Sequence, residues 1–182
     1  MSALHPSALH PSARRVCDWA AAKGLELEVH EYPKDGARTA EDAANAVGCK
    51  VDQIVKSMIF SLSTDSNAAN SATEEGEPAE SELVLALTAG SNKIDPKALA
   101  AIANGDRCGR ADPEQVRSIT GYAIGGVPPF AHANRLRTWI DPHLLTFDEV
   151  WAAAGTPRHV FPIAPARLLE LTGAVEAPFT AS

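Results

Sequence analysis

The chain lacks the residue patterns of several common functional classes. Its three cysteines lie far apart with no CxxC pair, which argues against a disulfide framework and excludes a CxxC-type zinc site. We therefore expect reduced thiols in a cytoplasmic protein. There is no GxSxG, HExxH, Walker A or Rossmann pattern, so these hydrolase, protease and nucleotide-binding classes find no support. No run is apolar enough to span a membrane, and the first residues lack the apolar segment of a signal peptide.

Composition and charge indicate one globular domain with an uneven surface. Hydrophobic residues make up 45% of the 182 residues and charged residues 21%, which is typical of a folded domain with a sizeable core. The net charge of −7 argues against a general nucleic-acid coat. Five acids and no Lys or Arg lie within residues 64–81. The basic residues elsewhere therefore form either a local basic face or, more simply, separate charges on a solvated surface.

Composition also divides the chain. Residues 1–11 contain the pentapeptide SALHP twice, and we expect a flexible N-terminal segment. Residues 12–175 form the predicted domain, and 176–182 a C-terminal tail. The acidic stretch 64–81 is rich in Ser, Asn, Ala and Glu, which predicts a mobile insertion between two strands.

Periodicity and capping signals predict an α/β domain with a mixed sheet, because helices and strands are mixed without strict alternation. Asp-Pro pairs, N-cap residues and terminal glycines mark the helix ends. The expected helices span residues 12–22 (capped by Ser12), 39–48, 96–103, 113–119 and 165–172. The expected strands span residues 25–32, 53–62, 83–88, 137–140 and 159–163, the last at a sheet edge because of Pro162. Residues 150–154 fit a strand or a helix.

Two features suggest a site for an anionic ligand. The stretch from Gly121 to Phe130 holds three glycines and two prolines, which favours a preset bend with outward-facing amides that can receive a carbonyl or oxyanion. Lys56 is a single charge on an otherwise apolar strand, suited to phosphate or carboxylate. The alternatives are an ordinary tight turn at Gly125, Gly126 and Pro129, and a lysine that reaches water from a sheet edge.

Four further residues are weaker candidates for substrate contact. Asn92 and Lys93 follow a strand and precede a helix, where an anion could bind or where an ordinary polar turn would lie. His132 follows the glycine–proline loop. His159 fits either an acid–base group or a plain edge histidine.

Beyond these features, the sequence resembles the YbaK/prolyl-tRNA synthetase-associated editing-domain family over roughly residues 12–175. Four blocks carry the likeness, and Gly125 and Pro129 match the family's G-x-x-x-P loop. The blocks are 51–60 with the strand lysine Lys56, 83–99, 111–130, and the group 139–141, 150–155 and 159–173. The acidic insertion and the duplicated pentapeptide depart from the family pattern.

The resemblance implies a compact, partly barrel-like mixed sheet surrounded by helices. It implies hydrolysis of the ester in mischarged tRNA, most often tRNA-Pro carrying a small non-cognate amino acid, with water as the attacking species and neither metal nor cofactor. Lys56 would hold a phosphate of the CCA end, while Gly125 and Pro129 would cup the aminoacyl carbonyl. The expected partners are the tRNA acceptor end and prolyl-tRNA synthetase. The alternative is a non-catalytic module that binds an aminoacyl or nucleotide group.

Overall fold

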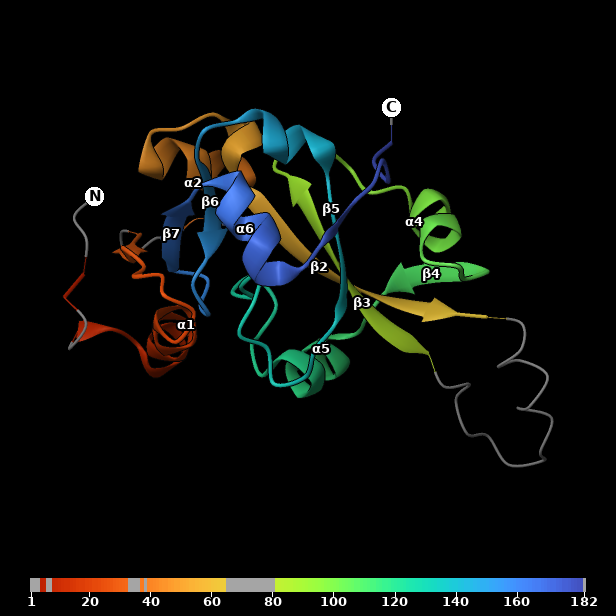
Figure 1. The fold of residues 1–182 in the computed structure, drawn as a ribbon, viewed down its shortest axis with the longest axis horizontal. Coiled ribbons are helices and arrows are strands. Elements are labelled where there is room, and N and C mark those ends of the chain that lie inside the picture. Colours follow the sequence, from red (N-terminus) through yellow and green to blue (C-terminus); the bar gives the residue numbers. More distant parts are fainter. Residues whose placement is uncertain (1–3, 6–7, 33–36, 38, 65–80, 182) are drawn as a thin grey trace.

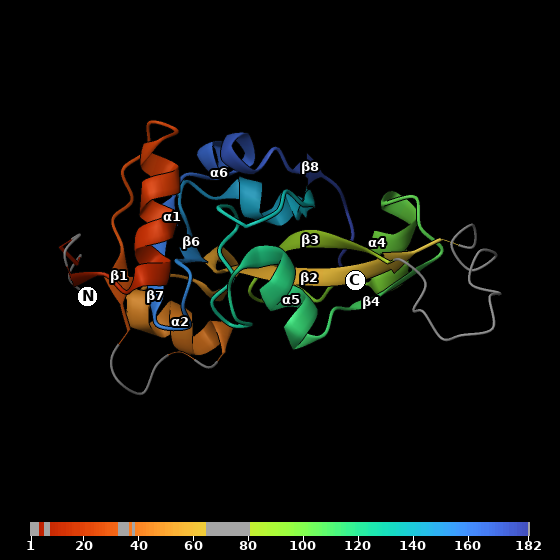
Figure 2. The same ribbon diagram turned by 90° about the horizontal axis from the view of Figure 1, so that it is seen from below.

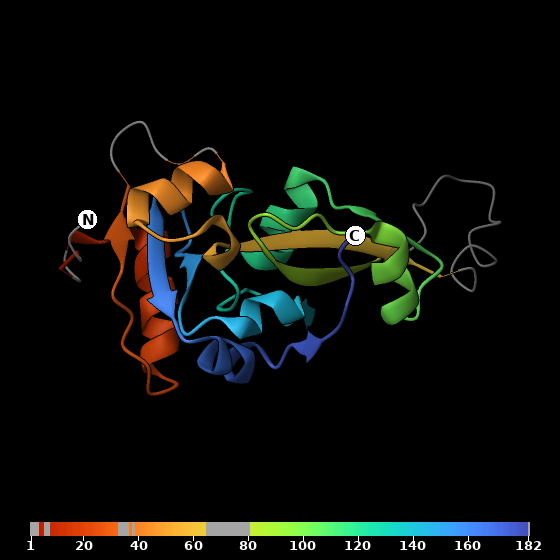
Figure 3. The same ribbon diagram turned by 90° about the horizontal axis from the view of Figure 1, so that it is seen from above.

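The computed structural model describes residues 4–5, 8–32, 37, 39–64 and 81–181. Figures 1, 2 and 3 show an elongated molecule. At one end lie the strands β6 (Val150–Ala153) and β7 (His159–Ile163) with the helices α1 (Pro11–Ala21) and α2 (Ala40–Val47). At the other end lie the helix α4 (Pro96–Ile102) and the strand β4 (Arg107–Arg110). Within the described residues, no helix is long and apolar enough to cross a membrane.

The larger sheet has five strands in the order β4-β2-β3-β5-β8. Its strands are β2 (Val55–Ser63), β3 (Glu82–Ala89), β4 (Arg107–Arg110), β5 (Arg137–Ile140) and β8 (Val175–Glu176). β2 pairs antiparallel with β3 and β4, while β5 pairs parallel with β3 and β8. The sheet is therefore mixed, as predicted.

The smaller sheet is antiparallel in the order β1-β7-β6. It consists of β1 (His30–Glu31), β6 (Val150–Ala153) and β7 (His159–Ile163). A single parallel bridge between Ile54 and Trp151 joins it to the start of β2. The expected partly barrel-like sheet is thus two linked sheets without closure, and the predicted single-domain α/β class is confirmed.

Local sequence signals set the helix ends. The helices are α1 (Pro11–Ala21), α2 (Ala40–Val47), α4 (Pro96–Ile102), α5 (Pro113–Thr120) and α6 (Pro165–Thr172), with short 3₁₀ turns η2 (Val51–Gln53) and η3 (Pro142–Thr146). Thr39 and Asp42 form a capping box before α2, and Gly48 ends it in the left-handed conformation. α1 begins one residue before the expected Ser12, because the ring of His10 accepts from the Ser12 amide and takes the N-cap role.

The helices cover both faces of the larger sheet. Leu99 and Ala100 of α4 pack with Phe60 and Trp139 on one face. The other face packs on α5 and α6, through residues that include Val116 and Leu168. This arrangement gives two apolar layers with β2 and β3 between them.

Two of the expected strands differ from expectation. Only His30 and Glu31 of the expected strand 25–32 form a ladder, with Val160 and His159 of β7, and the Tyr32 amide adds a hydrogen bond to the Arg158 carbonyl. β7 lies between β1 and β6, so the expectation that it lies at a sheet edge is wrong. Pro162 is tolerated there because it extends past β1, where its missing N–H breaks no ladder bond.

The ends of the predicted domain also differ. The packed domain extends beyond residue 175, since Phe179 is fully buried beside α4. Near the start, the amide of Leu4 donates to the carbonyl of Val29. Most of the expected insertion at 64–81 lies outside the described residues.

Candidate active site

Lys56 projects from the second position of β2 and is held by the turn that follows β3. Its Nζ donates to the carbonyl oxygens of Gly90, at 2.9 Å, and Asn92, at 2.6 Å. An ammonium has three donors, so one N–H remains for another acceptor. The side chain is half-buried rather than extended into water, so the strand lysine has a defined position.

A buried carboxylate fixes the turn that holds Lys56. Asp141, 2% exposed, accepts at Oδ2 from the Thr88 hydroxyl, the Ala89 amide and the Asn92 side-chain amide, at 3.1, 3.2 and 2.8 Å. Its Oδ1 accepts from the His143 amide at 3.0 Å. Asp141 thus positions Asn92, whose carbonyl in turn positions Lys56.

The surroundings of Lys56 disfavour its charged form on balance. Desolvation lowers the pKa of Lys56 below its ordinary value, and the positive charges of Arg110 and Lys93 act in the same direction. The carboxylates of Glu41 and Asp141 oppose this shift. These neighbours place Lys56 in a site of concentrated charge.

The glycine–proline loop forms a tight turn from Ala123 to Gly126. The Gly126 amide donates to the Ala123 carbonyl at 3.0 Å, and Gly125 at the third position has φ +87°, a conformation that favours glycine. Gly126 lies against the chain after β6, since a Cβ there would meet Thr156 Cα at 2.5 Å. The turn is therefore pressed against residues 155–157.

Lys56 and this turn share one cavity of about 670 Å³. The cavity lies at the junction of the two sheets, and most of its walls are apolar. Ile124 and Gly125 of the turn line it, with Val127 just after the turn. β2, α2 and β6 contribute other lining residues, among them Ala40, Ala43, Met58 and Trp151. The two features that the sequence singled out separately therefore meet in space.

Several polar groups of this cavity have no internal partner. The backbone amides of Ile124, Gly125 and Val127 donate no hydrogen bond within the described part of the chain. Ser57 also lines the cavity, and its buried Oγ has no hydrogen-bond partner in the same part of the chain. Free amides beside an apolar cavity can stabilise a developing oxyanion.

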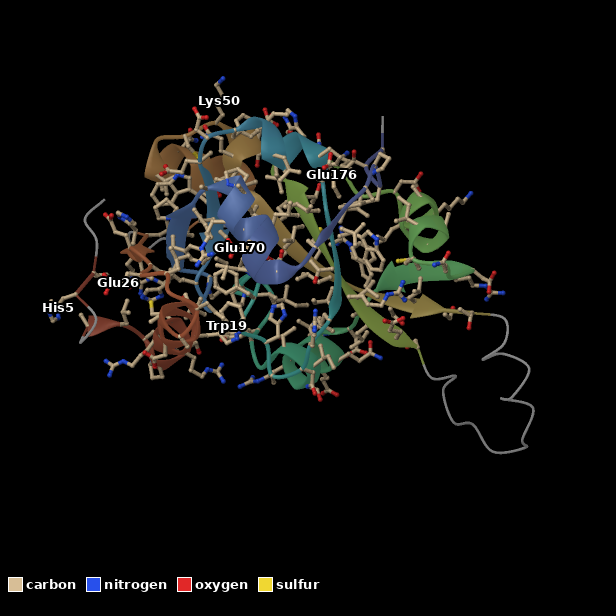
Figure 4. All side chains as sticks on the ribbon, in the orientation of Figure 1. His5, Trp19, Glu26, Lys50, Glu170 and Glu176 are labelled. Atoms are coloured by element: carbon tan, nitrogen blue, oxygen red, sulfur yellow. The ribbon has the colours of Figure 1, made fainter. Side chains whose placement is uncertain are left out.

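Pro129 and His132 lie in a different cavity, of about 410 Å³. It is also lined by Trp19 and Glu170, both labelled in Figure 4. The loop diverges there because Phe130 stacks on Trp19 of α1 with ring centroids 4.9 Å apart.

His132 and His159 are both held by internal bonds. His132 Nε2 lies 2.7 Å from the Pro128 carbonyl oxygen, and burial lowers the pKa of its ring. His159 Nδ1 lies 2.5 Å from the Thr156 hydroxyl, and burial lowers its pKa too. Neither ring lines the cavity that Lys56 shares with Gly125.

Sequence reasoning gave no role to Asp141, Ser57 or Arg110. Asp141 carries a local signal, an Asp-Pro pair directly after an apolar strand, and it caps η3. Ser57 and Arg110 carry none, because their positions depend on strand pairing. Among the described residues, no group of three or more His, Cys, Asp or Glu side chains is arranged to hold a metal ion.

The fold and this cavity define a class of small α/β proteins with a strand lysine facing a glycine turn. Residues 34–171 match the family model of the aminoacyl-tRNA editing domain. The chain belongs to this family.

Individual relatives agree with that assignment. A solved structure described as a candidate trans-editing enzyme for prolyl tRNA synthetase is 41% identical, with a TM-score of 0.81 over 96% of this chain and 100% of that one. The uncharacterised protein YwhH of Bacillus subtilis (strain 168) is 29% identical over 147 residues, 81% of this chain and 82% of its own. The multifunctional Ser/Thr-tRNA deacylase ProXp-y of Escherichia coli (strain K12) is 37% identical over 73 residues, 40% of this chain and 44% of that protein. The predicted family and the predicted enzyme class, an aminoacyl-tRNA deacylase, are confirmed.

Proposed function

We propose that this protein hydrolyses mischarged tRNA in trans, with tRNA-Pro carrying a small non-cognate amino acid as its main substrate. The observation that carries the proposal is the single cavity shared by Lys56 and Gly125. The tRNA-Pro preference is supported by the relative described as a candidate trans-editing enzyme for prolyl tRNA synthetase. The acceptor end of the tRNA and that synthetase are the proposed partners, and the cytoplasm is the proposed location.

The amino acid would lie in the apolar cavity with its ester carbonyl against the turn. The amides of Ile124, Gly125 and Val127 would then face the oxygen that becomes negative when water attacks. An aminoacyl ester is already activated. A water molecule held in position and donors to the oxyanion are therefore sufficient for its hydrolysis. Removing one such donor typically costs about 10²–10³ in rate.

Lys56 would contribute its remaining N–H and its positive charge to the substrate's terminal nucleotide. The carbonyls of Gly90 and Asn92 hold the ammonium in place before substrate arrives, so little side-chain ordering is needed on binding. Within the G-x-x-x-P loop, Gly125 would be the contact residue and Pro129 a positioning residue, because Pro129 lines the other cavity.

The cavity would select amino acids mainly by excluding large side chains. One methylene changes binding by only about 1–3 kcal/mol in an apolar pocket, so neighbouring small amino acids would be poorly separated. The unpartnered Ser57 hydroxyl could satisfy a polar side chain. Seryl, threonyl, alanyl and cysteinyl esters are therefore the substrates to compare.

The test is release of labelled amino acid from tRNA-Pro charged with each of these four amino acids. We expect turnover of at least one ester by the native protein and a loss of about 10²-fold or more in Lys56→Ala, because both the ammonium and its fixed position disappear. Lys50→Ala is the matched control, since Lys50 is exposed and points outward in Figure 4. No turnover of any ester by the native protein, with binding retained, would instead favour the non-catalytic binding module.

A further inference from the structure

We propose that a second cavity beside Lys56 binds the phosphate on the 5′ side of the terminal adenosine of the acceptor strand. The inference rests on the proposed function, because it assumes an RNA 3′ end at Lys56. It assigns Arg110 as a substrate-binding residue and gives Lys93 a specific ligand. It also fixes the side of the molecule from which the RNA arrives.

The second cavity has a volume of about 320 Å³ and a strongly basic lining. Three of its lining residues are the cations Lys56, Lys93 and Arg110, and none is acidic. Met58 and Phe60 are among the apolar residues of its walls. A small recess with three cations and no carboxylate in its wall suits a phosphodiester, whose oxygens accept several charge-assisted hydrogen bonds.

Strand pairing explains why these cations converge. Arg110 of β4 lies directly opposite Phe60 of β2, and directly opposed residues of an antiparallel pair project to the same face. Lys56, Met58 and Phe60 alternate along β2 and share that face. Arg110 therefore reaches the face of β2 that carries Lys56, and Lys93 comes from the turn after β3.

Arg110 and Lys93 are available for a ligand. Both residues are exposed, and neither side chain has an ion pair or hydrogen bond to the described residues. Lys56 differs, because two of its N–H groups already bind the carbonyls of Gly90 and Asn92. A phosphate held by Lys56 alone would receive one hydrogen bond, whereas Arg110 can offer a bidentate contact.

The two cavities share Lys56 and Met58 as lining residues. A substrate that spans them would place its ester in the larger apolar cavity and its phosphate in the smaller basic one, with the ammonium between. The acceptor strand would then leave over β4 and α4, which lie together at one end of the molecule in Figure 1. The cavity that contains Pro129 and Trp19 would remain free of RNA.

The test compares two substrates that differ in this phosphate. One is a mischarged tRNA-Pro microhelix, and the other is the same amino acid esterified to adenosine. Arg110→Ala and Lys93→Ala should each lower kcat/KM on the microhelix about tenfold or more, with little change on the adenosine ester. The slope of log(kcat/KM) against log[salt] should also become shallower by about 0.7 for each lost phosphate contact.

Arg107→Ala is the matched control. Arg107 lies on the same strand and is also exposed, but it pairs with Ser63 and does not line the cavity. Equal losses in Arg107→Ala and Arg110→Ala would reduce the effect to general charge and overturn the inference. The inference is also overturned if Arg110→Ala has the native kcat/KM on the microhelix, or if its kcat/KM falls equally on the microhelix and the adenosine ester.

Binding of the uncharged microhelix, followed by fluorescence anisotropy, separates this inference from the proposed catalysis. If the native protein hydrolyses neither ester but Arg110→Ala still weakens microhelix binding about tenfold relative to Arg107→Ala, the phosphate subsite stands and the hydrolytic function fails. If the native protein hydrolyses the microhelix ester and Arg110→Ala binds and reacts normally, the function stands and the subsite fails.

Discussion

Asp141 supports the site from behind and touches no substrate in our proposal. Among such supporting residues, its removal should cost the fold the most stability. Replacing Asp141 by alanine removes the acceptor for four donors at once. Two of them, the Thr88 hydroxyl and the Ala89 amide, belong to residues that are 0% exposed. Water has no ready access to them, so they would remain unsatisfied.

The expected magnitude follows from those two donors. Each buried donor left without a partner costs about 1–3 kcal/mol, so Asp141→Ala should lower the free energy of unfolding by about 2–6 kcal/mol. The backbone amide of the exposed His143 can instead donate to water, so its loss of Asp141 adds little to this destabilisation. A domain of this size is stable by about 5–15 kcal/mol, so the variant should fold with a clearly lower urea midpoint.

Urea denaturation followed by circular dichroism measures this loss. Asp112→Ala is the control, because Asp112 also accepts two backbone amide bonds, from Glu114 and Gln115, but is an exposed N-cap and should cost about 1 kcal/mol. In the folded fraction, Asp141→Ala should also lower deacylation, since Asn92 loses its anchor. Equal midpoints for the two variants would refute the argument that burial makes Asp141 critical.

Two further predictions concern the loop and its pH response. Gly126→Ala should destabilise the fold by about 1–3 kcal/mol, because its Cβ would overlap Thr156 Cα; Gly109→Ala, with open space around its Cβ, should be near neutral in the same urea titration. Burial lowers the pKa of His132, so the unfolded chain binds more protons and stability should fall as pH drops below about 6.5. His132→Gln should reduce the change in thermal unfolding midpoint between pH 7 and 5, with the remainder left to His159, whose pKa burial also lowers; a slope identical to the native one would contradict this assignment.

The helices could be predicted from the sequence because the residues that begin and end them act locally. Thr39 with Asp42, the Asp-Pro pairs before α4 and α5, and the terminal glycines act within one turn of the chain. Strand pairing was harder to predict because it depends on distant partners. β4 has the sequence RCGR, which shows no apolar alternation, and it forms because β2 offers a free edge beside residues 60–63.

The candidate site could be predicted from the sequence where single residues are unusual for the segment that contains them. Lys56 is a charge in an apolar strand and Gly125 requires positive φ, and both line one cavity. Pro129 and His132 follow Gly125 closely in sequence but line another cavity, because Phe130 is drawn onto Trp19. Arg110 gave no signal, since only the register of β4 on β2 brings it to Lys56.

The position of the cavity follows from the way the start of β2 is linked to the smaller sheet. Ile54, the residue before β2, bridges to Trp151 of β6, while β4 pairs only with residues 60–63 of β2. Between these two contacts, residues 55–58 of β2 pair with β3 but with no second strand among the described residues, and such an edge presents unpaired backbone N–H and C=O groups. The glycine turn faces this stretch, and Lys56 lies within it. The same interruption in pairing therefore opens the cavity and leaves its lysine accessible, which is why a charge is tolerated at this point of an otherwise apolar strand.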